Sequence, residues 1–216
     1  KNPTLLISCG RKSVIPSIVL KNYLHTKNNM EVYNIHIQDP KVQINNFNFI
    51  VVPEHDRLEG ENVIKSKGAI HYITDEEIQG AKALAISKNV LTVILGGPNK
   101  YYSFSLEELK RLFHKIELLF LNKVEEIKII SSRRTPESIV SFLRDRYKDN
   151  PKVIVDSSLS RKNYIEALAQ AKKIIVTSDS ISMLSEAATT GVPIYLAKLK
   201  SYKNDHRFNS FLELFK

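Results

Sequence analysis

The sequence of 216 residues contains a single cysteine, Cys9, and no apolar run long enough to cross a bilayer. One cysteine excludes an intramolecular disulfide framework and a cysteine-rich zinc site, and it indicates a reducing compartment. A membrane span needs about 20 consecutive apolar residues, so we predict none. The first residues also lack the apolar core of a signal peptide. We therefore expect a cytoplasmic protein.

Acidic residues are fewer than basic ones. The sequence has 23 Asp and Glu residues and 32 Lys and Arg residues, which gives a net charge of +9. The lysines are spread along the chain, without an arginine-rich block or interleaved aromatic residues. This distribution is typical of a solvated basic surface and predicts no specific nucleic-acid partner. It remains compatible with anionic small ligands. A composition of 43% hydrophobic and 25% charged residues excludes disorder.

Short apolar segments alternate with longer amphipathic ones, which is the pattern of a parallel α/β sheet. Strands are predicted at 4–8, 32–37, 49–52, 69–73, 90–95, 127–130, 153–155, 174–177 and 194–197. Helices are predicted at 13–24, 74–87, 106–121, 136–147, 164–171, 181–190 and 208–215. The order predicts two α/β domains, 1–73 and 74–216. Both look truncated, and the start at Lys1 without a methionine indicates a fragment or a processed product.

Four predicted strand ends carry residues suited to an anionic ligand. In open parallel sheets, ligands bind at the carboxyl ends of strands, where helix N-termini present their N–H groups. Glycine permits close approach, and arginine pairs with phosphate through its forked guanidinium. The candidates are Gly10 and Arg11; Gly96, Gly97 and Lys100; Ser132, Arg133, Arg134 and Thr135; and Asp179, Ser180, Ser182, Met183 and Glu186.

Each of these turns also has a structural interpretation, as an ordinary turn or a capped helix with solvated basic residues. The glycine pair fits neither the Walker loop nor the dinucleotide fingerprint, which both need further glycines at fixed spacing. Glu186 lies one to two turns into its helix, where it could accept ribose hydroxyls or face solvent. The crowding of hydroxyl residues before it favours a phosphate site.

A second cluster holds titratable residues. His55 and Asp56 follow a predicted strand, and Asp39 ends the preceding one, so these three residues could supply a general base. Adjacent residues on one loop rarely ligate a single ion well, and no His or Cys pair lies elsewhere at metal spacing. We predict no metal site.

Six segments together resemble the elongated-mitochondria fission family: 7–13, 36–40, 52–56, 96–100, 132–136 and 178–187 occur in the same order. That family includes plant mitochondrial fission factors and many bacterial proteins labelled as nucleoside-diphosphate-sugar epimerases. The last segment is also similar to the nucleotide-sugar site of GT-B glycosyltransferases. The resemblance implies two Rossmann-like domains that face each other across a cleft. It also implies that the C-terminal segment, which in the family returns to the first domain, is missing here.

The resemblance further implies a role for each candidate residue. Ser180, Ser182 and Met183 would line the diphosphate, and Glu186 would meet the ribose. Gly96 and Gly97 would pass close to the donor, whereas Gly10, Asp39 and the loop of residues 54–56 would form the acceptor side. The epimerase label conflicts with the sequence in two respects. The sequence lacks the dinucleotide fingerprint, and it lacks a reductase-type Tyr-x-x-x-Lys pair.

Two functional hypotheses follow. The first is a GT-B-like glycosyltransferase that takes a nucleoside-diphosphate sugar as donor and a lipid or cell-envelope molecule as acceptor, at the surface of a membrane. Asp39, His55 or Asp56 would act as base, and Lys100, Arg133 and Arg134 would stabilise the leaving diphosphate without an obligatory cofactor or metal. The second is a non-catalytic scaffold that keeps this fold, because fold alone does not decide function.

Overall fold

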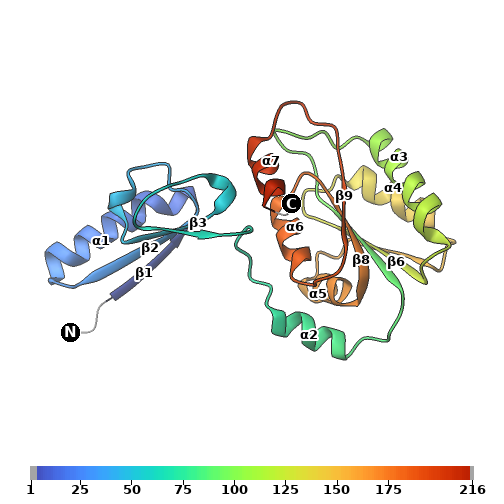
Figure 1. The fold of residues 1–216 in the computed structure, drawn as a ribbon, viewed down its shortest axis with the longest axis horizontal. Helices are drawn as coiled ribbons and strands as arrows, with labels where there is room; N and C mark the ends of the chain where they lie inside the picture. Colours follow the sequence, from blue (N-terminus) through green and yellow to red (C-terminus); the bar gives the residue numbers. More distant parts are fainter. Residues whose placement is uncertain (1–3, 215–216) are drawn as a thin grey trace. The chain divides into compact units, whose positions relative to one another are not determined.

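The computed structural model describes residues 4–214, which divide into two compact units (Figure 1). The first unit contains the residues up to Ile70 together with the segment that begins at His206, and the second unit is His71–Asp205. The C-terminal segment was predicted to belong to the second domain, and its return to the first domain was predicted to be missing. It joins the first unit instead, because α7 (His206–Glu213) packs on the short helix η3 (Glu54–Asp56).

A parallel sheet of order β1-β2-β3-β4 forms the first unit. Its strands are β1 (Thr4–Cys9), β2 (Val32–Ile37), β3 (Phe49–Pro53) and β4 (Val63–Ser66), with η1 (Arg11–Ser13), α1 (Val14–Asn28) and η2 (Ile44–Asn46) between them. The strand predicted at 69–73 is wrong, since the edge strand is β4. Its four residues, Val-Ile-Lys-Ser, are too few to show a strand period in the sequence.

Only one face of this sheet is covered within the first unit. Val14 of α1 packs with Phe47, Ile50 and Val52 in a small buried core. The other side chains of the strands form an open apolar face, on which Leu5, Ile7, Tyr33, Phe49 and Ile64 are 58%, 59%, 40%, 42% and 52% exposed. Parallel sheets are ordinarily covered on both faces, so this face is unusual.

The second unit is a doubly wound parallel sheet of order β7-β6-β5-β8-β9. Its strands are β5 (Val90–Leu95), β6 (Glu126–Ser131), β7 (Val153–Asp156), β8 (Ala171–Thr177) and β9 (Ile194–Ala197). Its helices are α2 (Asp75–Ala83), α3 (Leu106–Ile116) continued by the π-helical turn η4 (Glu117–Leu121), α4 (Glu137–Tyr147), α5 (Arg161–Gln170) and α6 (Ile181–Ala188). The predicted class, two Rossmann-like α/β sheets, is confirmed.

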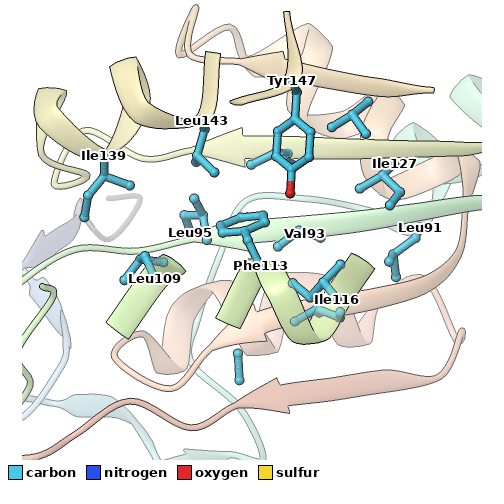
Figure 2. Close-up of a cluster of buried hydrophobic side chains, with 14 of the residues drawn as sticks. Leu91, Val93, Leu95, Leu109, Phe113, Ile116, Ile127, Ile139, Leu143 and Tyr147 are labelled. Carbon is cyan, nitrogen blue, oxygen red and sulfur yellow. The ribbon is translucent and has the colours of Figure 1, made fainter. Parts of the chain in front are cut away.

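Every residue of the central strand β5 is buried, because helices cover both of its faces. Alternate residues point toward α3 and α4, where they meet Leu109, Phe113 and Leu143 (Figure 2). On the opposite face, the Thr92 hydroxyl donates a hydrogen bond of 2.7 Å to the Ala167 carbonyl in α5. The Ser105 hydroxyl caps α3 by accepting from the Glu108 amide at 3.2 Å.

The strand order reverses at β5. The chain continues from β5 to β6 and β7 on one side, and then crosses to β8 and β9 on the other. Ligands of doubly wound sheets bind at such a switch point, beyond the carboxyl ends of the strands. The candidate turns that begin at Gly96, Ser132 and Ser178 all follow strands of this region.

Candidate functional site

A buried carboxylate occupies the switch point. The side chain of Asp179, just after β8, has no exposed surface. Its Oδ2 accepts hydrogen bonds from the Gly97 amide and from Arg134 Nη2, both at 2.9 Å, and its Oδ1 accepts from the Thr177 hydroxyl at 2.7 Å. Burying a charge is costly unless it is paired and hydrogen-bonded, and these three donors meet that requirement.

The two arginines predicted to form an anion cradle have different surroundings. Arg134 neutralises Asp179 and also donates through Nη1 to the Gly97 carbonyl at 3.0 Å. Its guanidinium is therefore engaged by the protein. Arg133 is exposed and lines a pocket described below. Of the two, Arg133 is the one that lines the pocket.

Close contacts with other atoms of the protein explain why residues 96 and 97 are both glycine. A Cβ on Gly97 would lie 2.0 Å from the Arg134 carbonyl oxygen, and one on Gly96 would lie 2.0 Å from Asp179 Oδ2. The Gly96 carbonyl in turn accepts from the Ser132 and Thr135 hydroxyls at 2.9 and 2.6 Å. The atoms closest to these two glycines thus belong to the Asp179 side chain and the Arg134 backbone.

A pocket of about 210 Å³ lies beside this network, at the carboxyl ends of β5, β6 and β7 and against α5 and α6. Apolar side chains and several polar groups line it together. They are Tyr72, Ile94, Ile130, Ser131, Ser132, Arg133, Asp156, Leu159, Ser160, Arg161, Tyr164, Met183 and Glu186. Four residues predicted for nucleotide binding, Ser132, Arg133, Met183 and Glu186, are thus brought to one cavity.

One carboxylate of the pocket is held by a tyrosine. The Tyr164 hydroxyl of α5 donates a hydrogen bond of 2.8 Å to Oε2 of Glu186 in α6. Burial raises the pKa of Tyr164 far above its usual value of 10.0, and the negative charge of Glu186 raises it further. The phenol therefore keeps its proton at neutral pH and acts as the donor.

Four other predicted residues of this unit lie outside the pocket lining. Ser180 caps α6, its hydroxyl accepting from the Met183 amide at 3.4 Å. Ser182 is exposed on α6, and the Lys100 ammonium lies 4.7 Å from the centre of the Tyr101 ring. Thr135 accepts from the Ser132 amide at 2.8 Å. Their predicted contacts with a nucleotide remain predictions.

The candidates in the first unit are engaged within that unit. His55 is 3% exposed and packs edge-on against Phe211 of α7, with 5.5 Å between ring centres. Asp56 forms an ion pair of 2.7 Å with Arg207 of α7. These contacts dock the helix, and the catalytic role predicted for His55 and Asp56 remains a prediction.

The other predicted residues of the first unit follow β1 and β2. Gly10 has a φ of 79°, which only glycine adopts readily, and its amide donates to the Ile37 carbonyl at 3.2 Å. Arg11 is exposed. Partial burial pushes the pKa of Asp39 upward, but hydrogen bonds from Lys41 and the charges of Lys41 and Arg11 outweigh it and lower that pKa. Asp39 is thus a carboxylate at neutral pH, and its proposed role as base is untested.

Among residues 4–214, no three or more His, Cys, Asp or Glu side chains are grouped so that they could hold a metal ion. Over the same residues, no helix is both long enough and apolar enough to span a bilayer.

Sequence reasoning missed Tyr164 and Asp156. Tyr164 lies within a predicted helix, on the same side as buried residues, and a tyrosine whose ring is buried there needs a hydrogen-bond partner for its hydroxyl. The sequence did not identify Glu186 as that partner. Asp156 ends a strand at the carboxyl edge, where its position alone could have marked it.

A model of the family described as Mitochondrial fission ELM1 matches residues 1–216. The chain belongs to this family. It is 26% identical over 223 residues to the Mitochondrial fission protein ELM1 of Arabidopsis thaliana, covering 90% of this chain and 51% of that protein. It is 28% identical over 233 residues to the Uncharacterized protein RP120 of Rickettsia prowazekii (strain Madrid E), covering 90% of this chain and 64% of the relative.

Solved structures share the fold. One is a Listeria monocytogenes protein provisionally described as a UDP-N-acetylglucosamine 2-epimerase, with a TM-score of 0.58, 10% identity, and coverage of 98% of this chain and 60% of that one. Another is the UDP-GlcNAc 2-epimerase of Methanocaldococcus jannaschii, with a TM-score of 0.54, 15% identity, and coverage of 99% and 69%. The family member described here thus has a GT-B-like fold, which it shares with these two proteins.

Proposed function

We propose that the second unit binds a nucleoside diphosphate, in the form of its sugar conjugate, in the pocket at the carboxyl ends of β5, β6 and β7. One observation carries this proposal. The same cavity is lined by a fixed carboxylate, Glu186, and by a cation, Arg133. A carboxylate accepts hydrogen bonds from sugar hydroxyls, whereas a guanidinium donates to phosphate.

The size and apolar lining of the pocket indicate which part of the ligand lies inside. A volume of about 210 Å³ is smaller than the roughly 300 Å³ at which sites for whole drug-sized ligands begin. We therefore place the nucleoside in the cavity, with its base against Ile94, Ile130 and Met183. The diphosphate and the sugar would extend past Arg133 along the rim. The N-terminus of α6, beside Met183, would add favourable N–H dipoles.

The chemistry we propose is transfer of the sugar by displacement at its anomeric carbon. Arg133 would stabilise the leaving diphosphate, a role for which no divalent ion or other cofactor is obligatory. The base would come from Asp39, His55 or Asp56, and the acceptor would be a lipid or cell-envelope molecule at a membrane surface in the cytoplasm. The chain spans about half to two thirds of the curated relatives it matches, so each of these assignments for the whole protein is part of the proposal.

Epimerisation of the same class of donor is the neighbouring enzymatic possibility. Of the two solved structures described above, one is named a UDP-GlcNAc 2-epimerase and the other is provisionally described as one. The two absences noted in the sequence, the dinucleotide fingerprint and the Tyr-x-x-x-Lys pair, argue only against a nicotinamide-dependent epimerase. The binding pocket would be the same for either reaction.

A non-catalytic scaffold is the second candidate function, and one observation favours it. The predicted bases His55 and Asp56 serve to dock α7, and Arg134 is committed to Asp179. Because these groups pair with other residues of the protein, their presence is explained without a catalytic role. The fission name of the family also fits a recruiting role.

Isothermal titration with UDP, CDP, ADP and GDP tests the binding proposal. We expect heat with at least one of them, and an affinity at least tenfold weaker for Glu186→Ala, because removal of a hydrogen-bonding carboxylate costs about 1.5–3 kcal/mol. Glu107→Ala, whose side chain is 74% exposed on α3, is the control. If the folded protein gives no heat with any of the four nucleotides, the binding proposal fails and the scaffold remains.

A further inference from the structure

We propose that Tyr164 is a positioning residue: its hydroxyl fixes the Glu186 carboxylate so that the pocket selects ligands with an intact ribose diol over their 2′-deoxy counterparts. This inference rests on the proposed function, and it adds the source of the selectivity. The 2.8 Å hydrogen bond between the Tyr164 hydroxyl and Glu186 Oε2 is its starting point.

The direction of this hydrogen bond determines which ligand group fits beside it. Burial and the nearby carboxylate raise the pKa of Tyr164, so the phenol is the donor and Glu186 is the acceptor. One oxygen of Glu186 is thereby occupied, and the other, Oε1, can only accept. A group of the ligand next to Oε1 must therefore be a donor, as a sugar hydroxyl is, and a phosphate there would be repelled.

The second carboxylate of the pocket does not compete for this role. Asp156 Oδ1 accepts from the Ser158 amide and Oδ2 from the Asn163 side-chain amide, both at 2.8 Å. Both of its oxygens therefore have protein donors. Among residues 4–214, Glu186 is thus the carboxylate of this lining that keeps an oxygen, Oε1, without a protein donor. We therefore place the diol beside Oε1, near α6, and the phosphates near Arg133.

Tyr164 and Glu186 belong to helices that are each anchored in the core. In α5, Ile165, Ala167, Leu168 and Ala169 are buried, and in α6, Leu184, Ser185 and Ala187 are buried. A free glutamate side chain loses rotamer entropy when a ligand immobilises it, and this loss weakens binding. The Tyr164 hydroxyl imposes that order before the ligand arrives, and so it improves affinity and selectivity together.

A matched pair elsewhere in the second unit separates positioning from stability. The Tyr147 hydroxyl donates to Glu117 Oε1 at 2.6 Å, and burial together with Glu117 raises the pKa of Tyr147. Neither residue lines the pocket. Tyr147→Phe therefore removes the same kind of tyrosine–glutamate hydrogen bond at a site that touches no nucleotide.

The experiment is isothermal titration of wild type, Tyr164→Phe, Glu186→Gln, the double variant and Tyr147→Phe with UDP, CDP, ADP and GDP and with the 2′-deoxy form of each. For the nucleotide that binds, we expect Tyr164→Phe to lose about tenfold in affinity for the ribonucleotide and much less for the deoxynucleotide. We expect the double variant to resemble Glu186→Gln, because the two residues act through one contact. Tyr147→Phe should keep wild-type affinity and selectivity.

Three results would overturn the inference. The first is unchanged selectivity in a folded Tyr164→Phe protein. The second is equal loss for ribose and deoxyribose ligands in that variant, which would mark a merely structural role. The third is wild-type selectivity in Glu186→Gln, and this result is decisive even if Tyr164→Phe does not fold. Absence of nucleotide binding by wild type would instead refute the proposed function itself, and with it this inference.

Discussion

Gly97→Ala is the most direct test of the buried network at the switch point. Gly97 is held between Asp179, which accepts its amide proton, and Arg134, whose side chain donates to its carbonyl. An added methyl carbon would lie 2.0 Å from the Arg134 carbonyl oxygen and 2.3 Å from its carbonyl carbon. These are backbone atoms, so no side-chain rotation relieves the clash.

The cost follows from the displacement that the methyl group requires. Real Cβ contacts are essentially never under 3.0 Å, so the turn after β6 must move by about 1 Å, which also lengthens the two hydrogen bonds of Gly97. Overpacking costs about 1–3 kcal/mol, and a weakened hydrogen bond to a charged group costs about 1.5–3 kcal/mol. We expect the second unit to lose about 3 kcal/mol, which corresponds to a fall in melting temperature of roughly 10 °C.

Thermal unfolding followed by circular dichroism measures this loss. Gly80→Ala is the matched control, because a Cβ at this position of α2 meets nothing within 4 Å. There, alanine should stabilise by about 0.5–1 kcal/mol through its helix propensity. If Gly97→Ala melts within about 2 °C of wild type, the close packing of Gly97 on Arg134 is refuted.

Two further predictions concern the first unit. Burial lowers the pKa of His36, and among residues 4–214 its buried Nε2 has no hydrogen-bond partner. The folded state therefore binds this proton less tightly than the unfolded state, and stability should be lost as pH falls below about 6.5. An NMR titration of the imidazole measures the shift, and a His36 pKa at or above the ordinary value of 6.5 would contradict it. On the open apolar face, Ile7→Lys should reduce binding of an apolar dye and any self-association in sedimentation, with little change in melting temperature, because Ile7 is 59% exposed. A large drop in melting temperature would show that Ile7 is buried instead.

Much of the fold could be predicted because its signals are local. The central strand Val90–Leu95 is a continuous apolar run, and Ser105 and Glu108 mark the start of α3. The prediction failed where a signal was short or depended on distant residues. β4 has two apolar residues, and α7 is placed by contacts with η3 far back in the chain.

For the candidate site, the sequence predicted which turns would meet but could not give their contacts. Carboxyl ends of adjacent parallel strands share an edge, so the turns at Gly97, Arg134 and Asp179 were expected to lie together, and in the structure they are hydrogen-bonded. The sequence shows that these residues are basic, but it does not show which group each of them pairs with. It therefore could not show that Arg134 neutralises Asp179 while Arg133 lines the pocket.

The division of the chain has a consequence for its synthesis. The first unit is discontinuous: Arg57 donates a hydrogen bond of 2.6 Å to Ser210, 153 residues later. A ribosome therefore releases the whole of His71–Asp205 before the last helix of the first unit exists. The inserted unit has all its strands in one stretch and can fold during translation, whereas the surrounding one reaches its final packing only after α7 has been synthesised.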